Sequence, residues 1–459
     1  MILRVAAKEL IRGYRLWVGS LIAIVASSAV CAAVLAQFAT AATLTDAQGD
    51  ELLSMSRGII AFSLLAAVAV TAATTNLAVA SGCRGYALLQ IAGVLPRQIV
   101  AIVLTQLVML AVIGSGIGVG LGRLIAQPLL NLAVTQTSVP IGTTVIYGAG
   151  TVAWTFGLFV AVTVMAGLRA AVRAGRVPPI DALREPEPPR IRMGALRWIA
   201  TGAAGLAALG LGLGAASMSP SLTLAGHPIG ASTIIGLGMM FSIALTGLAA
   251  SLGPVLYPLV LRAWTALVPS RLSGAWFLAR RSCRYRITQS TAAITPLTVG
   301  IALPGSLYTL FLTTSAATST GGRSEQINSV SIFTILGPAL LLAAIGSAAV
   351  IFMTSRTRAR DNALVTVSGG TLATTVFSAA FEAVIYVITA LLTAAMIFGL
   401  VGVVVATAFS HTTTGVLPVY GVSTALLIAG IGTIIVGAAT VLPAIAPQKQ
   451  SIPTLLATE

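Results

Sequence analysis

The sequence predicts an all-α polytopic membrane protein with about ten transmembrane helices, and three observations support this fold class. First, 57% of the 459 residues are hydrophobic and only 8% are charged, which is too little charge to cover a soluble protein. Second, apolar runs of about 20 residues recur along the chain, and each is long enough to cross a bilayer. Third, the alternation of a membrane β-barrel is absent, so each run must satisfy its backbone polar groups as a helix.

Ten such runs follow one another. They cover, in order, about residues 16–42, 58–80, 98–122, 144–168, 196–216, 230–260, 288–313, 328–354, 373–406 and 417–443. All but three of the 26 lysines and arginines fall in connections on one side of the membrane, and the exceptions are Arg57, Arg123 and Arg323. Cytoplasmic connections carry the excess of positive charge, so we expect both termini in the cytoplasm.

The net charge of +15 is therefore mainly an orientation signal. The distribution of the basic residues argues against a nucleic-acid partner. We expect membrane lipid to be the partner of this positive charge instead. Arginine far outnumbers lysine, since Lys8 and Lys449 are the only lysines. This bias favours a GC-rich bacterial source, and we expect the chain in the bacterial plasma membrane.

One segment of the chain occurs twice. Residues 84–106 can be aligned with residues 360–382, so that Arg84 pairs with Arg360, Gly93 with Gly369 and Gln106 with Glu382. In the same alignment Ala87 and Leu88 pair with Ala363 and Leu364. The repeat predicts two parallel four-span modules separated by a pair of linker spans. The expected domains are residues 1–190, 191–270 and 271–459.

Each copy of the repeated segment places a short basic stretch directly before a long apolar one. The first copy is amphipathic enough to lie at the membrane interface, and its glycine permits a sharp bend before the next span. We expect each copy to be an elbow helix that contacts a cytoplasmic partner. The residues expected to make this contact are Arg84, Tyr86, Ala87, Leu88, Leu89, Gly93, Arg97, Arg360, Ala363, Leu364 and Gly369.

A few residues inside the predicted spans are candidates for other roles. Glu382 is the only acid well inside a span, where a charge is expensive, so we expect it and its counterpart Gln106 to serve the transport path or a conformational switch. Gly114, Gly118 and Gly122 fall on one helix face and are expected to permit close helix packing. The two histidines, His227 and His411, are isolated, and no metal site is expected.

Several short motifs resemble those of the FtsX-like, macrolide-exporter (MacB-type, type VII) ABC transporter permeases. The pattern from Arg84 to Ile99, with Ala87, Leu88 and Gly93, resembles the cytoplasmic elbow of that family. Residues 173–184, which end in Pro-Ile-Asp-Ala-Leu-Arg, resemble the signature that follows the fourth span. The second elbow departs from the pattern, because Pro96-Arg97-Gln98 is replaced by residues 372–374. The two couplings are therefore expected to be unequal.

The resemblance implies a permease powered by a separate cytoplasmic ABC ATPase, in two copies, which binds ATP and Mg²⁺. The chain itself lacks a phosphate-binding Gly-x-x-x-x-Gly-Lys-Ser/Thr loop, so we expect neither a cofactor in this chain nor enzymatic activity of its own. The extracytoplasmic connections are short in this sequence. The expected activity is export or extraction of an amphipathic molecule from the membrane, such as a drug, an antimicrobial peptide or a lipid.

Two alternatives remain open at this point. The chain could be a stand-alone secondary transporter that uses Glu382 as a proton or ion site. It could also be a non-transporting membrane sensor that transmits motion to another protein.

Overall fold

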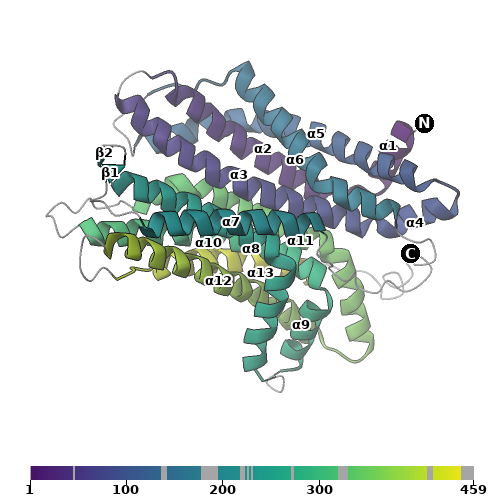
Figure 1. Cartoon of the computed structure of the whole chain (residues 1–459). Helices are drawn as coiled ribbons and strands as arrows, with labels where there is room; N and C mark the ends of the chain where they lie inside the picture. The colour runs from purple at the N-terminus through teal and green to yellow at the C-terminus, as the bar shows by residue number, and fades with distance from the viewer. Residues whose placement is uncertain are drawn as a thin grey trace.

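The computed structural model describes residues 2–44, 47–135, 142–176, 195–217, 223–224, 227–228, 231–269, 273–318, 329–410 and 417–445. Within them the chain is a bundle of long α-helices (Figure 1). Eight of these helices are long and apolar enough to cross a membrane. The fold class predicted from the sequence is therefore confirmed: the chain is an all-α polytopic membrane protein.

The first half of the chain forms six helices. A short amphipathic helix precedes the first apolar one, and a second short helix separates the next two. The helices are α1 (Ile2–Arg12), α2 (Tyr14–Ala41), α3 (Ala47–Ser81), α4 (Cys83–Ile91), α5 (Pro96–Val134) and α6 (Ala149–Gly175).

The remainder of the chain repeats part of this order after an intervening helix pair. A two-residue antiparallel ladder, β1 (Thr223–Leu224) with β2 (His227–Pro228), connects that pair. The helices are α7 (Ala195–Ser217), α8 (Ala231–Leu267), α9 (Gly274–Tyr285), α10 (Ile287–Thr318), α11 (Ser329–Val367), α12 (Leu372–Ser410) and α13 (Val422–Ile445).

Every predicted span corresponds to one helix. Eight qualify as spans over their described residues, and the other two are α11 and α13, whose apolar stretches Gly337–Met353 and Ala425–Val441 are shorter. Prolines such as Pro128, Pro296 and Pro338 lie inside these helices. Neighbouring helices in a membrane bundle can satisfy the backbone groups that a proline releases, so the helices continue past them.

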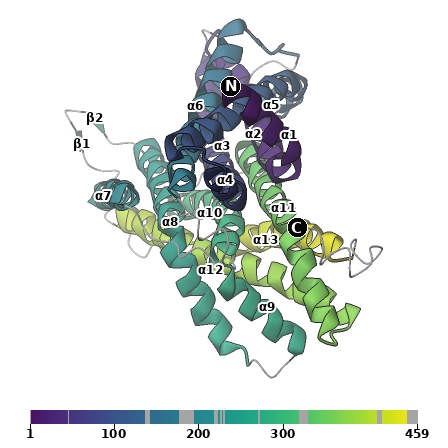
Figure 2. The same ribbon diagram turned by 90° about the vertical axis from the view of Figure 1, so that its right-hand side faces the viewer.

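Helix packing repeats between the two halves. In the first half α5 packs against α1, α2 and α6, and α3 packs against α2 and α6. In the second half α12 packs in the same way against α9, α10 and α13, and α11 packs against α10 and α13. The helices of the first half lie together in the upper part of Figures 1 and 2, and α10, α12 and α13 lie below them.

The two halves meet where α3 packs against α10 and α11, and α2 packs against α11. Glycine permits this close approach on both sides. A Cβ added to Gly346 of α11 would lie 2.5 Å from Val70 Cγ2, and one added to Gly19 of α2 would lie 2.9 Å from the Ala349 oxygen. Small residues at such contacts let helix backbones come together in a bilayer.

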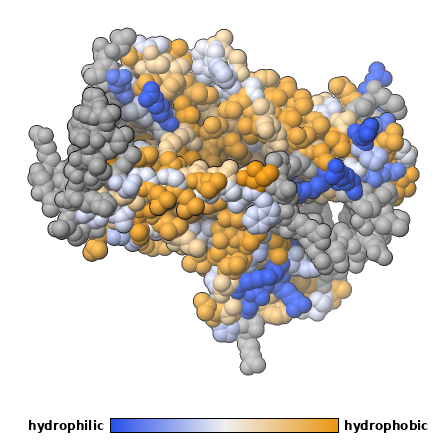
Figure 3. Space-filling model, viewed as in Figure 1, coloured by the Kyte–Doolittle hydropathy of each residue, from blue (hydrophilic) through white to orange (hydrophobic). Residues whose placement is uncertain are grey.

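The polarity of the bundle is that of a protein surrounded by lipid. Large apolar side chains of the peripheral α7 point outward, with Leu206 73% and Leu213 69% exposed, whereas many of the fully buried side chains are serine or threonine. Hydrophobic residues cover most of the side of the bundle in Figure 3, and hydrophilic patches lie at its right-hand end, over α9 and at its upper left. This arrangement places the exposed apolar surface against acyl chains.

Candidate coupling site at the elbow helices

The first elbow is a short helix set off from the span before it. Gly82 separates α3 from α4, and α4 ends in a left-handed turn at Gly93, whose φ is +92°. The Gly93 amide donates to the Gln90 oxygen at 2.9 Å and the Val94 amide donates to the Leu89 oxygen at 3.0 Å. These two bonds form a Schellman motif, which ends a helix at a glycine and reverses the chain direction.

The next span starts immediately after this turn. Leu95 is extended, and Pro96 occupies the first helical position of α5, where its missing N–H is no loss. The Leu95 amide donates to Gln98 Oε1 at 3.1 Å, which fixes the first turn of the helix.

The second elbow reaches the same geometry with different residues. Gly369 also has a φ of +92°, and the Gly370 amide donates to the Val365 oxygen at 2.8 Å. Here α11 runs without a break to Val367, and the following helix is capped by a threonine in place of proline and glutamine. The Thr374 amide donates to Thr371 Oγ1 at 3.3 Å. The sequence departure at residues 372–374 therefore exchanges one helix start for another and leaves the turn intact.

Gln106 joins three elements beneath the first elbow. Tyr86 of α4 donates its hydroxyl hydrogen to Gln106 Oε1 at 3.0 Å, and Gln106 Nε2 donates to the Ala6 oxygen of α1 at 3.4 Å. Both side chains are buried. Burial, with smaller contributions from Cys83 and Glu9, raises the pKa of Tyr86, so its hydroxyl remains a donor. The contacts of Gln106 connect α1, α4 and α5, and its expected role in the transport path or a conformational switch stays a prediction.

A further contact ties the elbow to the end of α6. Gln90 Nε2 donates to the Gly175 oxygen at 3.3 Å, and a Cβ at Gly175 would lie 2.8 Å from the Pro96 oxygen. Burial raises the pKa of the Cys83 thiol, and the charge of Arg173 partly offsets this. The elbow helix α4 is thus held by α5 and α6, and Gln106 links α5 in turn to α1.

The residues expected to contact a partner fall into two groups, one that is buried and supports the elbow and one that is exposed. Tyr86 and Ala87 are buried, so a partner cannot reach them and they hold the elbow in place from below. Leu88 is 52% exposed, Arg97 and Gly93 are also exposed, and Leu89 is half-buried. The side chain of Arg84 lies outside the described residues.

Two exposed apolar residues that the sequence did not single out complete this surface: Ile91 is 52% exposed and Leu95 is 62% exposed. We call Leu88, Ile91, Leu95 and Arg97 the elbow surface. The i, i+3 spacing of Leu88 and Ile91 on α4 is a signal that could have identified Ile91, whereas Leu95 lies beyond the turn at Gly93 and has no such signal.

Only the backbone of the second elbow is described through residues 354–364. The side chains of Arg360, Ala363 and Leu364 therefore lie outside the described residues, while Gly369 is exposed at its turn. Next to it Val367 is 63% exposed.

Glu382 and Gln106 occupy the same place in their helices, since α5 and α12 are both 39 residues long and each begins ten residues earlier. Glu382 is 8% exposed. The adjacent Phe381 meets Trp276 of α9 edge to face, with ring centroids 5.6 Å apart. Glu382 thus lies where α12 packs against the amphipathic helix of its own half, as Gln106 does in the first half.

Gly114, Gly118 and Gly122 lie against α2. A Cβ added at Gly114 would lie 2.8 Å from Ile24 Cγ2, one at Gly118 would collide with Ser28 Oγ, and one at Gly122 would lie 2.8 Å from the Ala29 oxygen. The intervening Gly116 and Gly120 have open space around them. The glycines spaced four residues apart thus form the face of α5 that packs against α2, and the glycines between them lie on a face with open space.

The structure also contains a second repeated contact, at the opposite end of the bundle, that the sequence did not reveal. The Ile146 amide donates to Thr40 Oγ1 at 2.9 Å, and the Val419 amide donates to Thr313 Oγ1 at 3.2 Å. In each half an extended segment before the last helix is thereby held by a threonine of the first span. No sequence similarity between these segments was evident beforehand.

Two other expectations lie partly outside the described residues. Residues 177–194, with the motif after the fourth span, are not described, and neither is His411. His227 is in β2, and the described residues contain no group of three or more metal-binding side chains.

Comparison with known proteins agrees with the resemblance over part of the first half of the chain. Residues 57–179 match the model of the family described as FtsX-like permease C-terminal. The matched segment runs from α3 through the elbow and α5 to just beyond α6. A search of curated proteins finds no match. The chain therefore carries an FtsX-like permease domain at residues 57–179.

Proposed function

We propose that this chain is the permease subunit of an ABC transporter and that a separate cytoplasmic ATPase docks on its elbow surface. The FtsX-like domain supports this proposal, because that family implies a partner ATPase in general. The observation that carries it is the elbow surface, where Leu88, Ile91 and Leu95 are each more than half exposed beside Arg97. Clustered exposed apolar side chains mark a protein contact site.

The elbow is built to transmit force. Its underside is fixed to α1, α5 and α6 through Gln106 and Gln90, so a push on α4 acts on the start of α5. That helix of 39 residues is about 58 Å long at 1.5 Å per residue, enough to cross the whole bilayer. Closure of the ATPases would move one half of the bundle against the other and reach the outer side through α5 and α12.

The repeated packing of the two halves supports a two-module plan with one ATPase per module, in the plasma membrane of a bacterium. The two couplings would be unequal, because α4 is separated from α3 by Gly82 whereas the second elbow continues α11 directly.

The substrate class that fits best is an amphipathic molecule exported or extracted from the membrane, such as a drug, an antimicrobial peptide or a lipid. An apolar groove with a volume of about 190 Å³ lies between α8 and α12 and supports this choice. Its walls are Leu245, Leu252, Met396 and Leu400, with neighbouring residues of the same two helices. An acyl chain or a flexible apolar side chain is the kind of group that such a groove accepts.

The test is affinity purification of the tagged full-length chain from its source cell, followed by mass spectrometry. We expect an ABC ATPase to co-purify with the wild-type chain and to be lost from the Leu88→Arg/Ile91→Arg variant. Leu417→Arg is the matched control, because Leu417 is 77% exposed at the opposite end of the bundle. Retention of the ATPase by the elbow variant would reject the docking site.

Transport by the purified complex in vesicles separates this function from the alternatives. ATP should drive transport in the wild type and in Glu382→Gln. If a proton gradient drives transport without any ATPase, and Glu382→Gln abolishes it, the chain is a secondary transporter. Absence of transport under both conditions would favour a sensor.

A further inference from the structure

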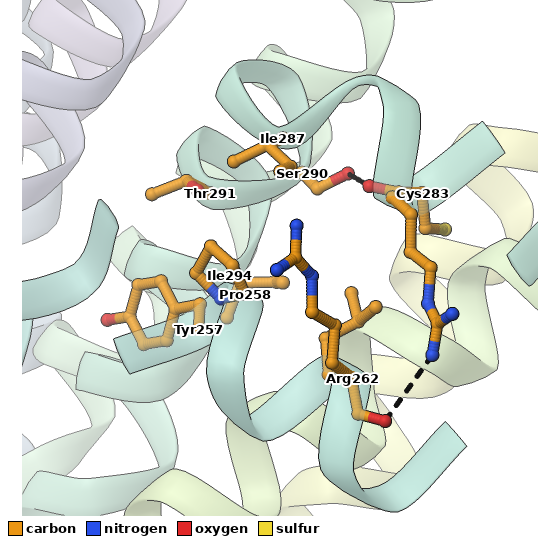
Figure 4. Close-up of a pocket in the computed structure, with 10 residues that line it drawn as sticks. Tyr257, Pro258, Arg262, Cys283, Ile287, Ser290, Thr291 and Ile294 are labelled. Carbon is orange, nitrogen blue, oxygen red and sulfur yellow. Dashed lines mark hydrogen bonds between the residues drawn. The ribbon is translucent and has the colours of Figure 1, made fainter. Parts of the chain in front are cut away.

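A basic pocket lies at the cytoplasmic ends of the helices that join the linker pair to the second half. It is formed by the end of α8, the end of α9 and the start of α10. Figure 4 shows Arg262 reaching from α8 toward the first turns of α10, where Ser290 and Thr291 lie. Ser290 donates to the Cys283 oxygen at 3.0 Å, which holds α10 against α9.

The pocket concentrates positive charge without a carboxylate. Its lining includes Arg262 and Arg284 and no carboxylate, and the sequence around it, residues 261–287, contains no aspartate or glutamate. Burial and the neighbouring charges of Arg280 and Arg262 lower the pKa of Arg284, although an arginine remains protonated at neutral pH. Like charges held this close repel one another, so the cluster is stabilised when an anion binds between them.

The donors of these arginines are only partly used. Arg284 Nη2 donates to the Arg262 oxygen at 3.3 Å and to Thr265 Oγ1 at 3.0 Å. In contrast, Nε of Arg284 and Nε of Arg280 are buried and have no hydrogen-bond partner among the described residues. A buried donor without a partner costs free energy, and a phosphate oxygen would remove that cost.

The surroundings of the pocket are those of a membrane interface. Leu267 is 83% exposed, Tyr285 is 62% exposed and Phe277 is 44% exposed, all on α9 or at the adjoining end of α8. Exposed apolar and aromatic side chains next to arginines are typical of helices that lie among lipid headgroups.

We propose that this pocket binds the phosphate group of an anionic phospholipid from the cytoplasmic leaflet, with Arg262 and Arg284 as its cationic ligands and Arg280 as a neighbouring charge. Basic pockets between the cytoplasmic ends of membrane helices suit such headgroups. In the first half, the corresponding helix α1 carries Glu9 next to Lys8, which balances part of its positive charge. This lipid site is independent of ATPase docking on the elbow surface.

The proposal is tested by native mass spectrometry of the full-length chain in detergent, titrated with phosphatidylglycerol or phosphatidylcholine. Wild-type protein should retain phosphatidylglycerol in preference to phosphatidylcholine. The Arg262→Gln/Arg284→Gln variant should lower that affinity by roughly thirtyfold, since each arginine near a lipid surface contributes about a factor of five. Arg262→Lys/Arg284→Lys keeps the charge and should retain much of the preference, which separates loss of binding from loss of folding.

Arg4→Gln/Lys8→Gln is the matched control, because it removes the same charge from the corresponding helix α1. The proposal fails if this control weakens binding as much as the pocket variant, or if the two lipids bind the wild type equally. In a second titration, inorganic phosphate is added at millimolar concentration as a competitor of the lipid. If it displaces phosphatidylglycerol completely, the pocket is a site for free phosphate and the lipid assignment is wrong.

Discussion

Replacing Gly93 by alanine tests the contribution of the left-handed backbone turn to the first elbow without changing its side-chain packing. A Cβ at this position has nothing within 4 Å, so the substitution causes no collision. The cost comes from φ of +92°, a conformation that an L-residue adopts at an expense of about 1–2 kcal/mol. That strain acts on the turn that closes the Gly93–Gln90 and Val94–Leu89 hydrogen bonds.

The same free energy can be measured as local opening of the elbow. A loss of about 1–2 kcal/mol raises the open population about 5- to 30-fold. Hydrogen exchange at the amides of residues 93 and 94 in Gly93→Ala should accelerate by that factor. Gly369→Ala should do the same at Gly370, whose amide bonds to Val365.

Gly85→Ala supplies the matched control within the same helix. Gly85 also has nothing within 4 Å of an added Cβ, but its backbone is helical, so alanine should slow exchange slightly or leave it unchanged. Equal exchange in Gly93→Ala and Gly85→Ala would show that the left-handed turn does not hold the elbow, and the reasoning would be refuted.

Three further predictions concern the first elbow and the contact between α2 and α5. Gln106→Leu should leave the buried Tyr86 hydroxyl unpaired and destabilise the protein by about 1–3 kcal/mol. Adding Tyr86→Phe should recover part of this loss in a double-mutant cycle measured by unfolding. Strictly additive effects of the two substitutions would argue against the hydrogen bond. Burial raises the pKa of Cys83, so its thiolate forms at higher pH than that of a free cysteine. The rate of alkylation by iodoacetamide should therefore be lower than that of a free thiol at neutral pH and should rise at higher pH. A pH profile like that of free cysteine would contradict this. Gly118→Leu should disrupt the contact of α5 with α2 and lower the thermal stability, while Gly116→Leu and Gly120→Leu, which point into open space, should be tolerated; similar losses in all three would contradict the packing.

The candidate site shows where prediction from the sequence reached its limit. The repeat identified both elbow turns, since Gly93 and Gly369 share one alignment position and one backbone conformation. It also ranked Tyr86 and Ala87 with the surface residues. Which side of a short helix is covered depends on how the later helices α5 and α6 pack against it, and α6 reaches it from 85 residues away at Gly175, so burial of these two residues was not readable locally.

Gln106 illustrates the same limit. Its position within a span was evident, but its partners are Tyr86 and the backbone of Ala6, and the latter is 100 residues away. The pattern of apolar and polar positions along α5 carries no information on which remote carbonyl bonds to Gln106. The two contacts from Thr40 and Thr313 to extended segments were missed for the same reason.

The sequence by itself determined that this is a helical membrane protein with a doubled elbow, because span length, low charge and a repeated glycine turn are local properties of the chain. The tertiary structure alone decided which residues support the elbow and which remain exposed, and that three arginines converge at the ends of α8 and α9. Those properties arise from packing between segments far apart in the chain, where burial and charge proximity depend on the neighbours that folding supplies.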